Sequence, residues 1–174
     1  MHMAFKVLFI GLVCSLAIAL KAGAAEQPSS LTRTNMANGK KMSLYLVSGT
    51  VSAVGAEKTK LQDLPLEQAP LFTSDEIVRY DIGSHAFLLT KEAYEKVARL
   101  KVPTDGRAFV VSVGDRRVYS GAFWSVFSSV PWYGITIVQP RGKGRQELRI
   151  EPASTGQKDP RNDPEILAIM KSRK

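Results

Sequence analysis

Residues 106–121 read GRAFVVSVGDRRVYSG and predict a β-hairpin at the centre of the fold. The segment 108–113 is apolar at almost every position, which is typical of a strand buried on both faces. Residues 114–116 form the turn, because Gly and Asp favour tight turn geometry. Residues 118–121 then begin the returning strand. We therefore expect these two strands to pair and to organise the rest of the domain.

The segments around this hairpin alternate between strand and helix patterns. The pair Thr73 and Glu76 forms a capping-box pattern, and Thr90 and Asp163 are favourable helix N-caps. Runs of apolar and β-branched residues predict further strands at 44–54, 85–89, 135–138 and 146–150. Helical spacing of apolar residues predicts helices at 74–80, 91–101 and 164–172, with a short helical turn at 123–130. We expect the helix 164–172 to dock on the domain through Ile166, Ile169 and Met170; exposing this stripe to a partner is the alternative.

This order of elements predicts an α+β fold. We expect a two-layer sandwich in which one mixed or antiparallel sheet carries helices on one face, with a ferredoxin-like arrangement as the first interpretation. In that arrangement the segments 86–89, 108–113 and 135–138 lie side by side in a common sheet.

The N-terminus has the three parts of a secretory signal peptide. Lys6 supplies a positive start, residues 7–20 are uncharged and mostly apolar, and Ala22-Gly23-Ala24 offers small residues for cleavage after Ala24. An uncleaved anchor is the alternative interpretation, and lipidation of Cys14 is a weaker one. We expect a signal peptide at 1–24, a flexible leader at 25–43, one α+β domain at 44–151, and a linker with a C-terminal helix at 152–174. The predicted location is therefore the periplasm or the extracellular space.

Composition limits the classes of function. The chain has 174 residues with 24 Lys and Arg against 16 Asp and Glu, a net charge of +8, and it holds one Cys and two His. So few Cys and His predict neither a disulfide scaffold nor a metal cluster, and we expect no cofactor. A basic exported protein suits anionic surfaces or an acidic envelope partner, whereas nucleic acid is not expected in that compartment.

Several segments between residues 70 and 138 carry a family resemblance. They match in order and character the head subdomain in the first periplasmic domain of SecD/SecDF, the accessory subunit of the protein-export translocase. The matching stretches are 70–77 (PLFTSDEI), 86–93 (AFLLTKEA), 106–113 (GRAFVVSV), 118–120 (VYS) and 135–137 (ITI). The chain thus resembles a standalone SecDF-head-like protein. The resemblance implies a SecDF-head-like fold and contact with extended polypeptide, and it does not imply the motor function.

Aromatic residues concentrate in residues 123–133, which read FWSVFSSVPWY. Trp124, Trp132 and Tyr133 are candidate binding residues, because large rigid rings provide contact area at a low entropic cost. In the alternative interpretation the segment closes the core over the sheet. Trp124 lies off the stripe formed by Phe123, Phe127 and Val130, and we expect it to be the most exposed of these rings.

A basic hairpin follows the last central strand. Arg141, Lys143 and Arg145 surround two glycines and could hold an anion, with Arg149 on the next strand. The alternative is that these charges only protect an edge strand from aggregation.

The expected function is that of an exported, non-enzymatic binding or accessory module of the cell envelope. One alternative is an envelope hydrolase, which would need a pocket holding His85 or a close pair of carboxylates. Another is a secreted inhibitor or partner protein. The binding hypothesis predicts that Trp124 or Trp132 is accessible beside a groove.

Overall fold

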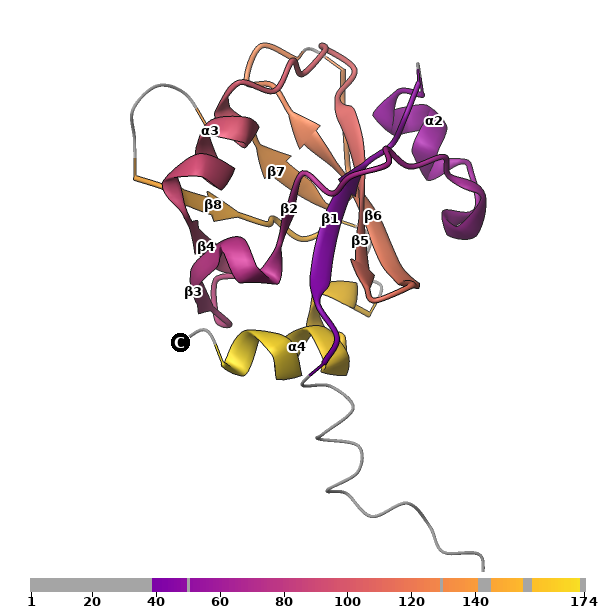
Figure 1. Ribbon diagram of the computed structural model, residues 1–174. Helices are drawn as coiled ribbons and strands as arrows, with labels where there is room; N and C mark the ends of the chain where they lie inside the picture. The colour runs from indigo at the N-terminus through magenta and orange to yellow at the C-terminus, as the bar shows by residue number, and fades with distance from the viewer. Residues whose placement is uncertain (1–38, 50, 129, 141–144, 155–157, 173–174) are drawn as a thin grey trace, which may run out of the picture.

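The computed structural model describes residues 39–49, 51–128, 130–140, 145–154 and 158–172. The predicted signal peptide, its cleavage point after Ala24 and most of the predicted leader lie outside these residues. The described chain is a mixed α+β fold in which two curled sheets enclose a common core (Figure 1). The α+β class is therefore confirmed. Among the described residues, no helix is both long and apolar enough to cross a bilayer.

The larger sheet is built around the predicted hairpin. Its strand order is β2-β1-β5-β6-β7, in which β6 pairs with β7 in parallel and all other neighbours are antiparallel. Its strands are β1 (Met42–Leu46), β2 (Phe72–Thr73), β5 (Arg107–Val113), β6 (Arg116–Trp124) and β7 (Thr136–Val138). The hairpin of β5 and β6 is the longest ladder, and its turn uses Gly114 in a left-handed conformation. The predicted hairpin is thus confirmed.

The smaller sheet has the order β3-β4-β8, with β3 (Ile77–Asp81), β4 (Ala86–Leu89) and β8 (Glu147–Arg149). The expectation that 86–89, 108–113 and 135–138 share one sheet is therefore wrong. A tight turn joins β4 to β3, and β8 takes the other edge of β4, so no edge of β4 remains for the larger sheet. Among the described residues, an isolated bridge between Thr136 and Glu151 connects the two sheets.

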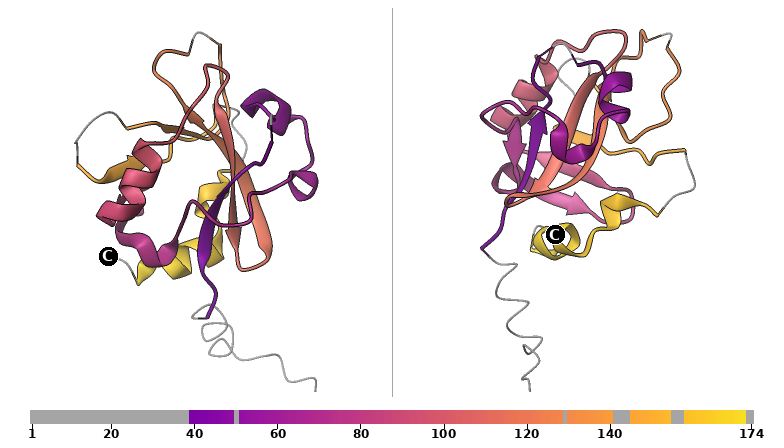
Figure 2. Two further views of the ribbon diagram at one scale, coloured as in Figure 1. Left: turned by 45° about the horizontal axis from the view of Figure 1, so that its top comes forward. Right: turned by 90° about the vertical axis from the view of Figure 1, so that its right-hand side faces the viewer.

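Helical segments lie on more than one side of the sheets. The segments are α2 (Ala53–Glu57), α3 (Lys91–Ala98), α4 (Pro164–Lys171) and the 3₁₀ turns η1 (Leu61–Asp63), η2 (Ser74–Glu76) and η3 (Pro160–Asn162). Figure 2 shows α2 against the outer face of the larger sheet and α4 across one end of the fold. The predicted N-caps are confirmed, since Thr90 accepts from the amide of Ala93 and Asp163 from that of Ile166.

The predicted C-terminal helix docks on the domain. Ile166, Ile169 and Met170 of α4 are buried in the main core. The guanidinium group of Arg116 at the start of β6 contacts Asp163 at 2.9 Å and Glu165 at 2.6 Å. The helix therefore belongs to the folded unit, and intramolecular docking is confirmed.

Three predicted elements differ from the structure. The first strand starts at Met42, within the predicted leader, and the segment 44–54 ends as α2 rather than as a strand. The Thr73 capping box forms, but only one 3₁₀ turn follows it because the β-branched residues after Glu76 continue as β3. In place of the predicted helical turn at 123–130, β6 extends to Trp124 and a single turn from Ser125 to Ser128 follows, as far as the described residues show.

Apolar clusters pack against both faces of the larger sheet. The main core fills the space between the two sheets, α3 and α4. A smaller cluster lies between the outer face of β5 and the segment that carries α2 and η1; its buried members are Val47, Ala56, Leu64, Ala108 and Val110. At Gly121 the strand passes so close to its neighbours that a Cβ atom would lie 2.5 Å from Phe109 Cζ and 2.7 Å from the carbonyl oxygen of Ile135.

Gly121→Ala is therefore expected to destabilise the fold. The added methyl group must displace both a core ring and the backbone beside β7, and overpacking of this kind costs about 1–3 kcal/mol. Denaturant unfolding measures the loss. Gly39→Ala is the matched control, since a Cβ atom there meets nothing within 4 Å. Equal unfolding midpoints for both variants would contradict the tight approach of β6 and Ile135.

Candidate functional site

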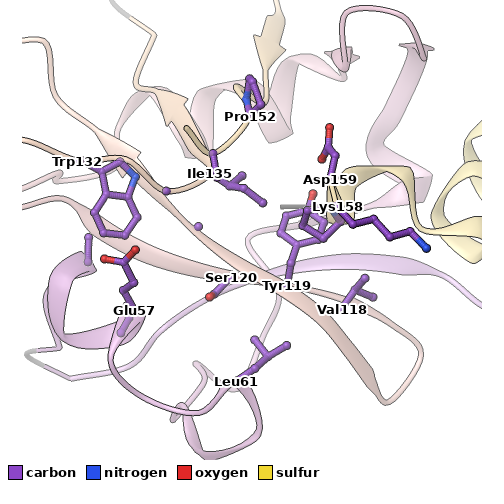
Figure 3. Close-up of a pocket in the computed structure, with 16 residues that line it drawn as sticks. Glu57, Leu61, Val118, Tyr119, Ser120, Trp132, Ile135, Pro152, Lys158 and Asp159 are labelled. Atoms are coloured by element: carbon purple, nitrogen blue, oxygen red, sulfur yellow. The ribbon is translucent and has the colours of Figure 1, made fainter. Parts of the chain in front are cut away.

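A groove of about 640 Å³ runs along one edge of β6 (Figure 3). Its floor is the backbone of residues 118–121 in the middle of β6. One wall comes from α2 and Leu61, and the other from residues 152–160 in the described part of the chain. Trp132, Gly134 and Ile135 close one end.

The edge of β6 is unpaired along this floor. β7 pairs with β6 only from Ala122 to Trp124, and the amide of Ala122 donates to the carbonyl of Ile135 at 2.9 Å. The chain before Ile135 then turns away, since the carbonyl of Tyr133 accepts from the amide of Ser154 instead. A fork therefore opens between β6 and the segment 133–135.

The ladder register directs the backbone of Ser120 into this fork. The carbonyl of Ala108 accepts a hydrogen bond from the amide of Val47, so the polar backbone groups of Ala108 face β1. Ala108 therefore exchanges no backbone hydrogen bonds with Ala122, its partner on β6. Bonded and non-bonded pairs alternate in an antiparallel ladder, so the pair Val110–Ser120 is also non-bonded. Both the amide and the carbonyl of Ser120 point away from β5. Among the described residues, no backbone hydrogen bond outside the regular elements involves Ser120.

The outer wall is fixed to β6 by one side chain. Arg117 Nη1 donates to the carbonyl groups of Leu61 at 2.8 Å, Gln62 at 3.0 Å and Leu64 at 2.7 Å. These bonds satisfy carbonyls that the short turn η1 leaves free, and they hold Leu61 over the groove. The hydroxyl of Ser52 caps α2 by accepting from the amide of Gly55. The wall is therefore preformed.

A stacked pair of indoles closes one end of the groove. The rings of Trp124 and Trp132 lie 5.5 Å apart at 20°, and both residues are partly buried. Trp132 lines the groove, whereas Trp124 packs behind it against Gly106. Trp132 Nε1 is buried and has no hydrogen-bond partner among the described residues. An indole donor in this state favours an incoming acceptor.

The opposite end is polar. Figure 3 shows Tyr119, Lys158 and Asp159 together at this end, with Glu57 near Trp132. Asp159 forms an ion pair with Arg161 at 2.6 Å, and hydrogen bonds from Arg161 lower the pKa of this carboxyl group. Burial raises the pKa of Tyr119 far above its ordinary value, so its hydroxyl stays protonated.

A buried polar cluster lies behind this end. The guanidinium group of Arg161 is held by Asp159 and donates to the carbonyl of Ile150. Tyr80 and His85 are joined by a hydrogen bond of 2.6 Å between the phenol oxygen and Nδ1. Burial raises the pKa of Tyr80 to about 12 and lowers the pKa of His85 below 6.5. These groups therefore act as a neutral pair at neutral pH.

The described residues that line the groove do not form the constellation that the hydrolase alternative requires. His85 is buried, its Nδ1 is occupied by Tyr80, and it does not line the groove. The two carboxylates that do line it, Glu57 and Asp159, lie at opposite ends (Figure 3). What the groove offers is a strand edge, apolar walls and a few polar groups at its ends.

The structure separates the predicted binding residues. Trp132 lines the groove, and Trp124 supports it without lining it. Tyr133 is exposed outside the groove, and Arg145 is exposed away from it. Arg141 and Lys143 lie outside the described residues. Trp124 is not the most exposed aromatic residue of this segment, because β6 carries it onto the sheet while Phe127 has an exposed fraction of 76%.

Sequence reasoning missed the floor and the polar end of the groove. Ser120 belongs to the predicted hairpin, but no local pattern shows that its outer edge stays unpaired. Lys158 and Asp159 were part of a predicted linker. The density of aromatic residues was the one signal that pointed to the groove, through Trp132.

Comparisons of the chain with protein-family models, with curated proteins and with solved structures found no match.

Stability is expected to fall as the pH drops below about 6.5, the ordinary pKa of histidine. The folded protein keeps His85 neutral to a lower pH than the unfolded chain does, so the unfolded chain binds the extra proton first. His85→Asn removes this proton site and suits the left-handed backbone at position 85, where φ is 51°. Urea unfolding between about pH 7 and pH 5 should therefore depend less on pH in this variant.

Tyr80→Phe serves as the control because it keeps the buried imidazole. It should retain the wild-type loss of stability over the same pH range. Asp159 does not cause this loss of stability. Its pKa is lowered from 3.8, so the stability that its ionised form contributes is lost only at more acidic pH. An unchanged pH profile in His85→Asn would contradict the assignment to His85.

Proposed function

We propose that this protein is a polypeptide-binding module, exported to the cell envelope, that adds an extended segment of its ligand to the open edge of β6 without chemically transforming it. The observation that carries the proposal is the backbone of Ser120, whose amide and carbonyl point into a preformed groove. An unpaired strand edge is a template for another strand.

Strand addition explains the shape of the groove. Main-chain hydrogen bonds to β6 supply affinity, and the two walls receive alternate side chains of the guest. One set would face α2 and Leu61, and the other would face Tyr119 and Pro160. The open edge over residues 118–121 has room for only a short strand, because β7 takes the edge from Ala122 onward.

The open edge of β6 is short and covered on both sides, which favours a binding site over a site of aggregation. A β-bulge interrupts the ladder near Val118, between the pairs made by Val111 and Ser112. The walls cover the open stretch on both sides. Native proteins protect strand edges with such devices, so a guest has to enter as a short, extended segment.

The resemblance to the SecD head motivates a polypeptide ligand but does not carry the proposal. The single sheet that the order of elements predicted is divided in two. The finer two-layer arrangement, the kinship, the export of the chain and the lack of enzymatic activity all stay predictions. The proposed ligand follows instead from the chemistry of an open backbone edge.

Ser120→Pro is expected to weaken binding of an unfolded chain by at least about tenfold, since it removes the outward amide and blocks the edge. The ladder to β5 does not use this amide, and proline is tolerated at a strand edge. Reduced, carboxymethylated α-lactalbumin is a suitable probe because it stays unfolded, with the native protein as the negative ligand. Fluorescence anisotropy measures the affinity.

Ser120→Ala is the matched control, because it keeps the backbone amide and should bind within about twofold of wild type. Pro152→Trp tests the same groove from an exposed position on its rim, away from the ladder, and should also weaken binding. Full binding by both Ser120→Pro and Pro152→Trp, or no binding by the wild-type protein, would refute strand addition at this edge.

A further inference from the structure

A second surface lies beyond the stacked indoles, in the loop that connects β6 to β7 and at the end of β7. Its members are apolar side chains that are exposed to solvent, and we name it the apolar tip: Val126, Phe127, Val130, Tyr133 and Val138. Phe127 alone is 76% exposed and Val126 is 56% exposed. A group of large exposed apolar side chains in one region marks a site of contact.

Charge is absent from the tip and present beside it. No residue in the sequence from 118 to 140 is charged. The neighbouring loop carries Arg99 and Lys101, both exposed. Arg99 also pairs with Glu95 at 2.9 Å, but its side chain remains 79% exposed. The same loop also holds Asp105, which is partly buried, so the exposed charges that border the uncharged tip are the two cations.

Hydrogen bonds hold the tip against the loop that carries these cations. The hydroxyl of Ser128 donates to the carbonyl of Thr104, and the side chain of Gln139 donates to the carbonyl of Leu100. The amide of Gln139 donates to the carbonyl of Trp124 at 3.0 Å, so the tip is also joined to the indole pair. The segment that carries the apolar residues therefore lies against the loop that carries the cations.

We propose that the apolar tip inserts into the surface of a membrane that contains anionic lipids, with Arg99 and Lys101 at the headgroups. Aliphatic and aromatic side chains partition into the boundary between headgroups and acyl chains, and bordering cations add attraction to anionic lipid. A protein partner that covers the tip would find no charged side chain within it, so no ion pair there could fix the orientation of the partner. The net charge of +8 favours an anionic surface in the same way.

Flotation of the purified protein with lipid vesicles tests this proposal. Vesicles of phosphatidylglycerol and phosphatidylethanolamine should bind the protein, and vesicles of phosphatidylcholine should bind it at least about tenfold less. Trp124 and Trp132 are the only tryptophans and lie beside the tip, so binding should also shift their emission to shorter wavelength. A salt concentration of about 0.5 M should weaken the binding.

Val126→Glu and Val78→Glu form a matched pair, because both valines are 56% exposed and only Val126 belongs to the tip. Val126→Glu should lose vesicle binding, and Val78→Glu should keep it. Phe127→Glu should also lose it and provides a second variant. An unchanged thermal midpoint verifies that each variant is folded.

Retained vesicle binding by both tip variants would overturn the proposal. A wild-type protein that ignores anionic vesicles would overturn it as well, and so would a protein partner that occupies the tip and keeps the chain off the vesicles. Binding of carboxymethylated α-lactalbumin reports on the groove separately. Val126→Glu should leave that binding unchanged, so failure of the membrane contact and failure of the proposed function are distinguishable.

Discussion

The structure depends on the unequal pairing of the two edges of β6. One edge is paired with β5 over nearly the whole strand, from Arg116 to Phe123. The other edge is paired only over three residues, where β7 lies alongside in parallel. A buried strand normally satisfies both edges, because an unpaired backbone group away from water is costly. The uncovered part of β6 is the floor of the groove.

The two walls of the groove stand beside this unpaired edge of β6, and each is held in place by hydrogen bonds. Ile135 accepts from the amide of Ala122, and the next residue, Thr136, forms the bridge with Glu151 that connects the larger sheet to the smaller one. Arg161 fixes the far wall through the carbonyl of Ile150, and Arg117 fixes the near wall through the carbonyls of Leu61 and Gln62 in η1. Each wall is thus held by an arginine that donates to backbone carbonyl groups. Such charge-assisted bonds are stronger than neutral ones, which suits a groove that must stay open without a ligand.

The local elements could be predicted from the sequence, and the pairing across the two sheets could not. Turn chemistry at Gly114 and caps at Thr90 and Asp163 act within a few residues, and all three appear as expected. The helical spacing of Phe123 and Phe127 was misleading because pairing with β5 overrides a local period. The division into two sheets depends on which strand takes each edge of β4, and that choice involves residues far apart in the chain.

The candidate site has the same dependence on long-range pairing. Aromatic density identified Trp132, since rings of this size are informative in any context. Ser120 gave no such signal, because its importance comes from the absence of a partner strand.

Hydrogen exchange of backbone amides tests most directly the central claim that the edge of β6 is open at Ser120. The amide of Ser120 should exchange fast and that of Ala122 slowly, and unfolded polypeptide should protect Ser120. Equal protection of both amides in the free protein would contradict the open edge on which the account depends.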